Sequence, residues 1–153
     1  MYLRFAAVNL IMNMLSYDLR KIWDPSLFQG NNKTKNYFEG WYFKSVSKDA
    51  EHKYAFIPGI AFSKDGSDRH AFVQMIDGET GKTDYFRYPI SEFMFDRDRF
   101  LVQIGANRFS KKGMDISIEQ DGRSIGGQLR FSELVELPVG LFRPGIMGWY
   151  RFV

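Results

Sequence analysis

One short segment places a carboxylate among aromatic side chains at the spacing of a β-strand. Within residues 36–46, the side chains of Tyr37, Glu39, Trp41 and Phe43 stand at every second position. Because side chains two residues apart share one face of a strand, we expect these four to lie together. In an apolar cavity, desolvation would raise the pKa of Glu39, and the neutral acid could protonate an alkene or an ether oxygen. Aromatic faces could then stabilise the resulting cation. Glu39 is therefore the predicted catalytic acid, and its three aromatic neighbours are predicted substrate contacts.

The alternative for this segment is structural. The same face could be partly solvated, with Glu39 paired to a nearby lysine or arginine, and the charge would then stay on the carboxylate. The sequence alone leaves both interpretations of Glu39 open.

A second candidate site lies further along the chain. His70 and Gln74 share one face of an expected strand, with Phe72 between them. A histidine with a near-neutral pKa can act as an acid or a base, so His70 and Gln74 are also predicted substrate contacts. A strand-end histidine bonded to a backbone carbonyl would instead be structural. Tyr85 and Arg87 share a face of the next expected strand. The aromatic rings of this strand either line a cavity or form the aromatic core of a sheet.

Composition argues against several classes of protein. The chain has 153 residues and no cysteine, which excludes disulfides and thiolate chemistry and fits a cytoplasmic location. The two histidines, His52 and His70, show no metal-binding spacing, so no metal is expected. Lysines and arginines are spread along the chain at a net charge of +3, which does not predict a nucleic-acid partner. Phosphate-binding loops and the GxSxG elbow are missing from the sequence, and no cofactor is predicted.

The rest of the chain predicts a series of short strands. Turn signals such as Asp77-Gly78 and Asp121-Gly122 separate them. Pro58 and Pro89 fall inside candidates, and each should mark an edge, a bulge or a strand end. The pattern favours an all-β, antiparallel, lipocalin-like barrel or sandwich. The candidates after residues 36–46 are 54–62, 70–76, 84–90, 99–104, 113–119 and 127–131.

The segments outside these strands suggest the domain organisation. Residues 1–15 are apolar and too short to span a bilayer, so no stable membrane span is expected. We interpret them as an extension upstream of a start at Met12 or Met14, in preference to a signal peptide. Residues 16–35 read as a lead-in helix and loop, residues 36–132 as the antiparallel β-domain, and residues 133–153 as an apolar crossover. An alternating aromatic strand begins at residues 149–153, which predicts that a second half follows.

Four motifs together carry a resemblance to a known family. The chain resembles the tocopherol cyclase family, in particular its small bacterial members, over residues 19–153, and GWYFK is the most specific part. The motifs are NYFEGWYFK (36–44), FIPGI (56–60), HAFVQMIDG (70–78) and PGIMGW (144–149).

The resemblance implies a fold and an activity. Family members look like two consecutive lipocalin-like barrels, so this chain would be the first half and the missing C-terminal half its partner. Plant members close a chromanol ring without a cofactor: an acid protonates a prenyl double bond and the phenol oxygen captures the cation. The implied enzyme is a cyclase acting on a lipophilic small molecule. The alternatives are a non-catalytic, lipocalin-like binder of an apolar ligand, because a barrel of about eight strands holds one small ligand, or a structural half-domain without a site.

Overall fold

Antiparallel strands dominate the computed structural model, which describes residues 17–21, 24 and 26–135, and the predicted all-β antiparallel class is confirmed. Residues 17–21 are helical. The 3-10 helix η1 (Gly30–Asn32) precedes β1, and the 3-10 helix η2 (Ile90–Glu92) joins the two sheets. The first sheet contains β1 (Tyr37–Gly40), β2 (Phe43–Val46), β3 (Lys53–Phe62), β4 (Arg69–Asp77) and β5 (Thr83–Pro89). The second contains β6 (Phe93–Phe95), β7 (Leu101–Ile104), β8 (Asn107–Ser110), β9 (Gly113–Gln120) and β10 (Arg123–Arg130).

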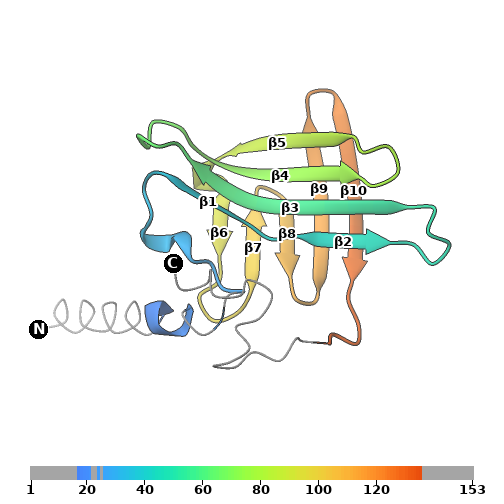
Figure 1. Cartoon of the computed structure of the whole chain (residues 1–153), viewed down its shortest axis with the longest axis horizontal. Helices are drawn as coiled ribbons and strands as arrows, with labels where there is room; N and C mark the ends of the chain where they lie inside the picture. The colour runs from blue at the N-terminus through green and yellow to red at the C-terminus, as the bar shows by residue number, and fades with distance from the viewer. Residues whose placement is uncertain (1–16, 22–23, 25, 136–153) are drawn as a thin grey trace, which may run out of the picture.

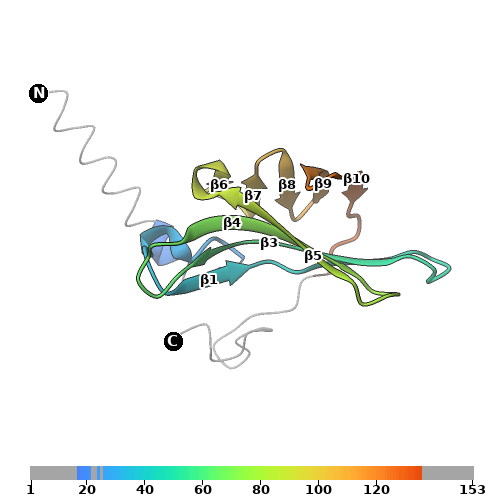
Figure 2. The same cartoon turned by 90° about the horizontal axis from the view of Figure 1, so that it is seen from above.

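The two sheets lie face to face as separate layers. In the first, β3 pairs with β4 on one side and with both β1 and β2 on the other, and β5 pairs with β4. The second is a meander in the order β10-β9-β8-β7-β6. Figure 1 shows the strands of the second sheet running across those of the first, and Figure 2 shows the two layers from above. This is the orthogonal form of sheet packing.

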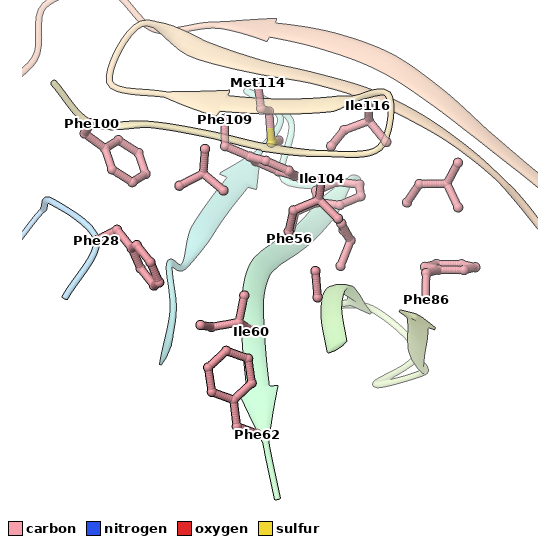
Figure 3. Packing of buried hydrophobic residues seen from close by; sticks show 14 residues of the cluster. Phe28, Phe56, Ile60, Phe62, Phe86, Phe100, Ile104, Phe109, Met114 and Ile116 are labelled. Atoms are coloured by element: carbon pink, nitrogen blue, oxygen red, sulfur yellow. The ribbon is translucent and has the colours of Figure 1, made fainter. Parts of the chain in front are cut away.

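Side chains from the inner faces of both sheets form the core. Strand alternation turns Phe56 and Ile60 of β3 inward, and Ile104, Phe109 and Ile116 meet them from the second sheet (Figure 3). Burying each side chain of this size contributes about 1.5–3 kcal/mol. The lead-in closes one end of this core, because Phe28 belongs to it and the Phe28 carbonyl accepts a 2.6 Å hydrogen bond from the Tyr17 hydroxyl.

Pro58 explains why the strand predicted at residues 36–46 is in fact two strands. β3 continues through Pro58, which pairs with Val73 of β4, so the prediction of an edge, bulge or end at Pro58 is wrong for β3 itself. The partner is interrupted instead. The Pro58 carbonyl accepts a hydrogen bond from Trp41 N–H, but proline has no N–H to return on that side. The ladder therefore stops at Gly40 and resumes at Phe43.

Other predictions meet mixed outcomes. Pro89 is the last residue of β5, as expected of a strand end. Asp121 and Gly122 have φ angles of 54° and 73° and form the predicted two-residue turn between β9 and β10. Strands β6 and β8 were not predicted, and β10 begins four residues before its predicted start at residue 127.

The predictions for residues 1–15 and 136–153 lie outside the described residues. None of the helices that the structure describes is long and apolar enough to cross a membrane.

Candidate functional site

β1 and the lead-in loop together enclose the carboxylate of Glu39. The backbone N–H of Gln29 donates to Glu39 Oε1 at 3.0 Å, and the N–H of Gly30 donates to Oε2 at 3.0 Å. The Tyr37 hydroxyl, two residues away on the same face, donates to Oε2 at 2.6 Å. The predicted common face of Tyr37 and Glu39 is thus present. Among the described residues, no ion pair includes Glu39, so backbone amides and a phenol take the place of the expected lysine or arginine.

Burial sets the electrostatics of this carboxylate. Desolvation raises the pKa of Glu39, while the hydrogen bonds from Tyr37, Gln29 and Gly30 and the charge of Lys21 oppose the rise. Burial and the neighbouring Glu39 also hold the pKa of the Tyr37 hydroxyl well above its ordinary value. Burial thus favours the neutral form of this carboxyl, while its oxygens serve as hydrogen-bond acceptors for the lead-in loop.

Trp41 and Phe43 continue the Glu39 face as packing residues. The Trp41 indole donates its N–H to the Ser26 carbonyl at 3.2 Å and stacks on Phe93 with ring centroids 6.5 Å apart. Phe43 lies against Phe109, 5.4 Å between centroids. Both rings pack against the core between the sheets. Both also border a small surface hollow of about 280 Å³.

His70 and Gln74 lie on the other face of the same sheet. Their neighbours Ala71 and Val73 are fully buried in the core between the sheets, so strand alternation turns His70 and Gln74 outward. The thickness of the sheet therefore separates them from Glu39, and the six predicted site residues do not form one site. Side chains, and not a backbone carbonyl, are the partners of the two His70 ring nitrogens: Nδ1 lies 3.2 Å from Asp68 Oδ1, and Nε2 lies 2.9 Å from the Tyr85 hydroxyl.

A second, larger hollow lies elsewhere, between the two sheets. It measures about 480 Å³ and is bounded by β2, β3 and β4 of the first sheet and β9 and β10 of the second. None of the six predicted site residues lines it. Its apolar walls are formed chiefly by Phe56, Met75, Met114, Ile116, Ile125 and Leu129.

A missing side chain creates part of this cavity. Gly127 pairs with the inward-facing Ile116 and stands between Ile125 and Leu129, which share its face. A Cβ built at Gly127 meets nothing within 4 Å. The sequence signal for this feature is the glycine at position 127, which interrupts the apolar alternation between Ile125 and Leu129.

The described residues contain no group of three or more histidine, aspartate or glutamate side chains that could hold a metal ion. Comparisons with known protein families, with curated proteins and with solved structures found no match. A function is therefore inferred from the geometry of the Glu39 face, the His70 contacts and the cavity between the sheets.

Proposed function

We propose that this protein binds a lipophilic small molecule in the cavity between its two sheets. The observation that carries the proposal is the cavity of about 480 Å³ with its apolar walls. Ligand sites of small molecules are typically concave, largely apolar and a few hundred Å³ in volume. The cavity leaves Phe56 and Ile116 facing unfilled space on opposite sheets, and a ligand that filled it would bury this apolar area.

Polar groups complete the lining and suggest the shape of the ligand. His52 and Gln128 are exposed and line the same cavity as the buried Met114. A molecule with an apolar body and one polar end would satisfy both regions, since a few polar groups usually fix orientation in such sites. This is the binding alternative predicted from the sequence, at a different location.

Two leucine substitutions test this proposal as a matched pair. The Gly127→Leu side chain would occupy the cavity, whereas Ser117→Leu places the same side chain at an exposed position of β9 that does not line the cavity. We expect the neutral fluorophore N-phenyl-1-naphthylamine to bind the unmodified chain and Ser117→Leu, with at least about tenfold weaker binding to Gly127→Leu. Equal melting temperatures would show that both variants fold. Equal affinities of the two variants, or no binding to the unmodified chain, would contradict the proposal.

Acid-initiated cyclisation is a second candidate, and the raised pKa of Glu39 is the observation that favours it. The family resemblance supports the same chemistry. Since Glu39 lines neither hollow in the described part of the chain, substrate would have to approach through the hollow bordered by Trp41 and Phe43. Incubation with a prenylquinol, followed by mass spectrometry, should show ring closure that Glu39→Gln abolishes and that Glu79→Gln, at an exposed turn, leaves intact. No ring closure by the unmodified chain would remove this candidate.

A further inference from the structure

The outer face of the first sheet carries an aspartate, a histidine and a tyrosine in hydrogen-bonded sequence. Asp68 Oδ1 lies 3.2 Å from His70 Nδ1, and His70 Nε2 lies 2.9 Å from the Tyr85 hydroxyl oxygen. Asp68 precedes β4, His70 is on β4, and Tyr85 is on the neighbouring β5. Both distances fall within the range in which a base activates a hydroxyl and a third group orients the base.

The partners of His70 determine the role of each ring nitrogen. Because the Asp68 carboxylate can only accept, Nδ1 carries the proton and the neutral ring presents its lone pair at Nε2. The Tyr85 hydroxyl therefore donates to Nε2. Arg87 donates a 2.7 Å hydrogen bond to Asp68, and this hydrogen bond keeps the pKa of Asp68 below the ordinary value, so the carboxylate stays ionised. The imidazole side chain is only 12% exposed, which limits its rotation.

Tyr85 can be reached from solvent beside an apolar surface. It is 44% exposed, and its ring stacks on Phe72 with 4.9 Å between centroids. Phe72 stacks in turn on the 65% exposed Phe38, so aromatic rings extend away from the hydroxyl. Burial raises the pKa of Tyr85, so the hydroxyl keeps its proton at neutral pH and needs a base to become a nucleophile.

We propose that Asp68, His70 and Tyr85 form an acyl-accepting site for esters of aromatic alcohols. The Tyr85 oxygen attacks the ester carbonyl carbon while its proton passes to His70 Nε2. The bond between the acyl carbon and the aromatic oxygen breaks, the electron pair leaves with the phenolate, and the acyl group remains on Tyr85. Asp68 stabilises the imidazolium that forms. Arg87, two residues from Tyr85 on the same face, supplies a positive charge beside the developing oxyanion. The 65% exposed ring of Phe38 offers an apolar surface for the leaving group.

The test measures which tyrosine of the full chain is acylated. The chain is incubated with p-nitrophenyl acetate, and peptide mass spectrometry follows acetylation of Tyr85 and of Tyr42, which is 63% exposed. Both ring nitrogens of His70 are already engaged, so Tyr42 takes no part in the relay and serves as an internal control. We expect Tyr85 to react at least tenfold faster than Tyr42 despite its lower exposure, with one p-nitrophenolate released per acetyl-Tyr85.

Two variants separate activation from mere exposure. His70→Gln should bring the Tyr85 rate down to that of Tyr42, and Asp68→Asn should lower it partially, while the Tyr42 rate stays constant as evidence of folding. A Tyr85 rate no higher than that of Tyr42 in the unmodified chain would overturn the proposal, as would an unchanged ratio in His70→Gln. The first comparison decides the matter even if a variant fails to fold.

Discussion

At the scale of single residues, the buried carboxylate of Glu39 makes a prediction about pH. Burial raises its pKa in the folded protein above the ordinary value of 4.5, so folding is accompanied by proton uptake between these two values. The contribution of Glu39 to stability is therefore largest below about pH 4.5 and decreases as pH rises through the folded pKa. Glu39→Gln removes this proton uptake.

We accordingly expect the free energy of unfolding of the unmodified chain, relative to Glu39→Gln, to fall as pH rises above about 4.5 and then to level off. Urea unfolding of both proteins from pH 4 to pH 8 measures the difference. A relative gain in stability with rising pH would instead mean that the hydrogen bonds from Tyr37, Gln29 and Gly30 outweigh burial.

Asn107 makes a second prediction at this scale. Its side chain is fully buried, donates to the Ile104 carbonyl at 3.0 Å and to the Tyr88 hydroxyl at 3.1 Å, and accepts from the Ser117 N–H at 2.8 Å. Asn107→Ala removes these three hydrogen bonds. We expect the free energy of unfolding, measured in urea, to decrease by about 2–3 kcal/mol. Asn32→Ala, at an exposed hydrogen bond to Asp18, is the control and should lose less than about 0.5 kcal/mol. Similar losses for both variants would contradict this account.

At the scale of elements, close packing between β1, β3 and β4 depends on Gly59. A Cβ there would lie 2.4 Å from the Glu39 carbonyl oxygen and 2.5 Å from the Phe72 ring. Gly59→Ala should therefore destabilise the protein by about 2–3 kcal/mol or more. Gly127→Ala, also in a strand but with nothing within 4 Å of the new Cβ, should stay within about 0.5 kcal/mol of the unmodified chain. Thermal and urea unfolding compare the two, and equal effects would show that space is not the cause.

The elements also show how far the sequence was informative. Local signals sufficed for the long strands and for the Asp121-Gly122 turn, because alternation and positive φ angles are properties of a few adjacent residues. The effect of Pro58 was not predictable, since it depends on which neighbouring strand its missing N–H would have faced. β6 and β8, of three and four residues, are too short to show a period.

The candidate sites, too, were predictable from the sequence only in part. The shared face of Tyr37 and Glu39 follows from spacing along one strand and was predicted. The contact of His70 with Tyr85 joins two strands whose register, with Gln74 opposite Tyr85, the sequence does not contain. The cavity depends on the distance between two sheets and on the absence of a side chain at Gly127, so it appears only once both layers are placed.

At the scale of the whole molecule, polar ties join the two sheets on one side. The Gln120 side chain donates to the Arg87 carbonyl at 2.7 Å, Arg123 forms an ion pair with Asp84, and Asn107 reaches Tyr88. All three ties run to β5 from the second sheet. The large cavity reaches from β9 and β10 to β2, β3 and β4, and its lining includes no residue of β5. The ties thus hold the layers together without occupying the space proposed for a ligand.

The walls of that space have one further consequence. Met75 and Met114 face the cavity from opposite sheets, and methionine is the most adaptable of the apolar side chains, with three rotatable bonds and a polarisable sulfur. Branched apolar side chains, which are stiffer, would select ligands by their shape. The two methionine side chains can instead adjust to ligands of different shape. Under the proposed function, selectivity would come from the overall size of a ligand and not from its exact shape, so the cavity would suit a class of compounds more than a single one.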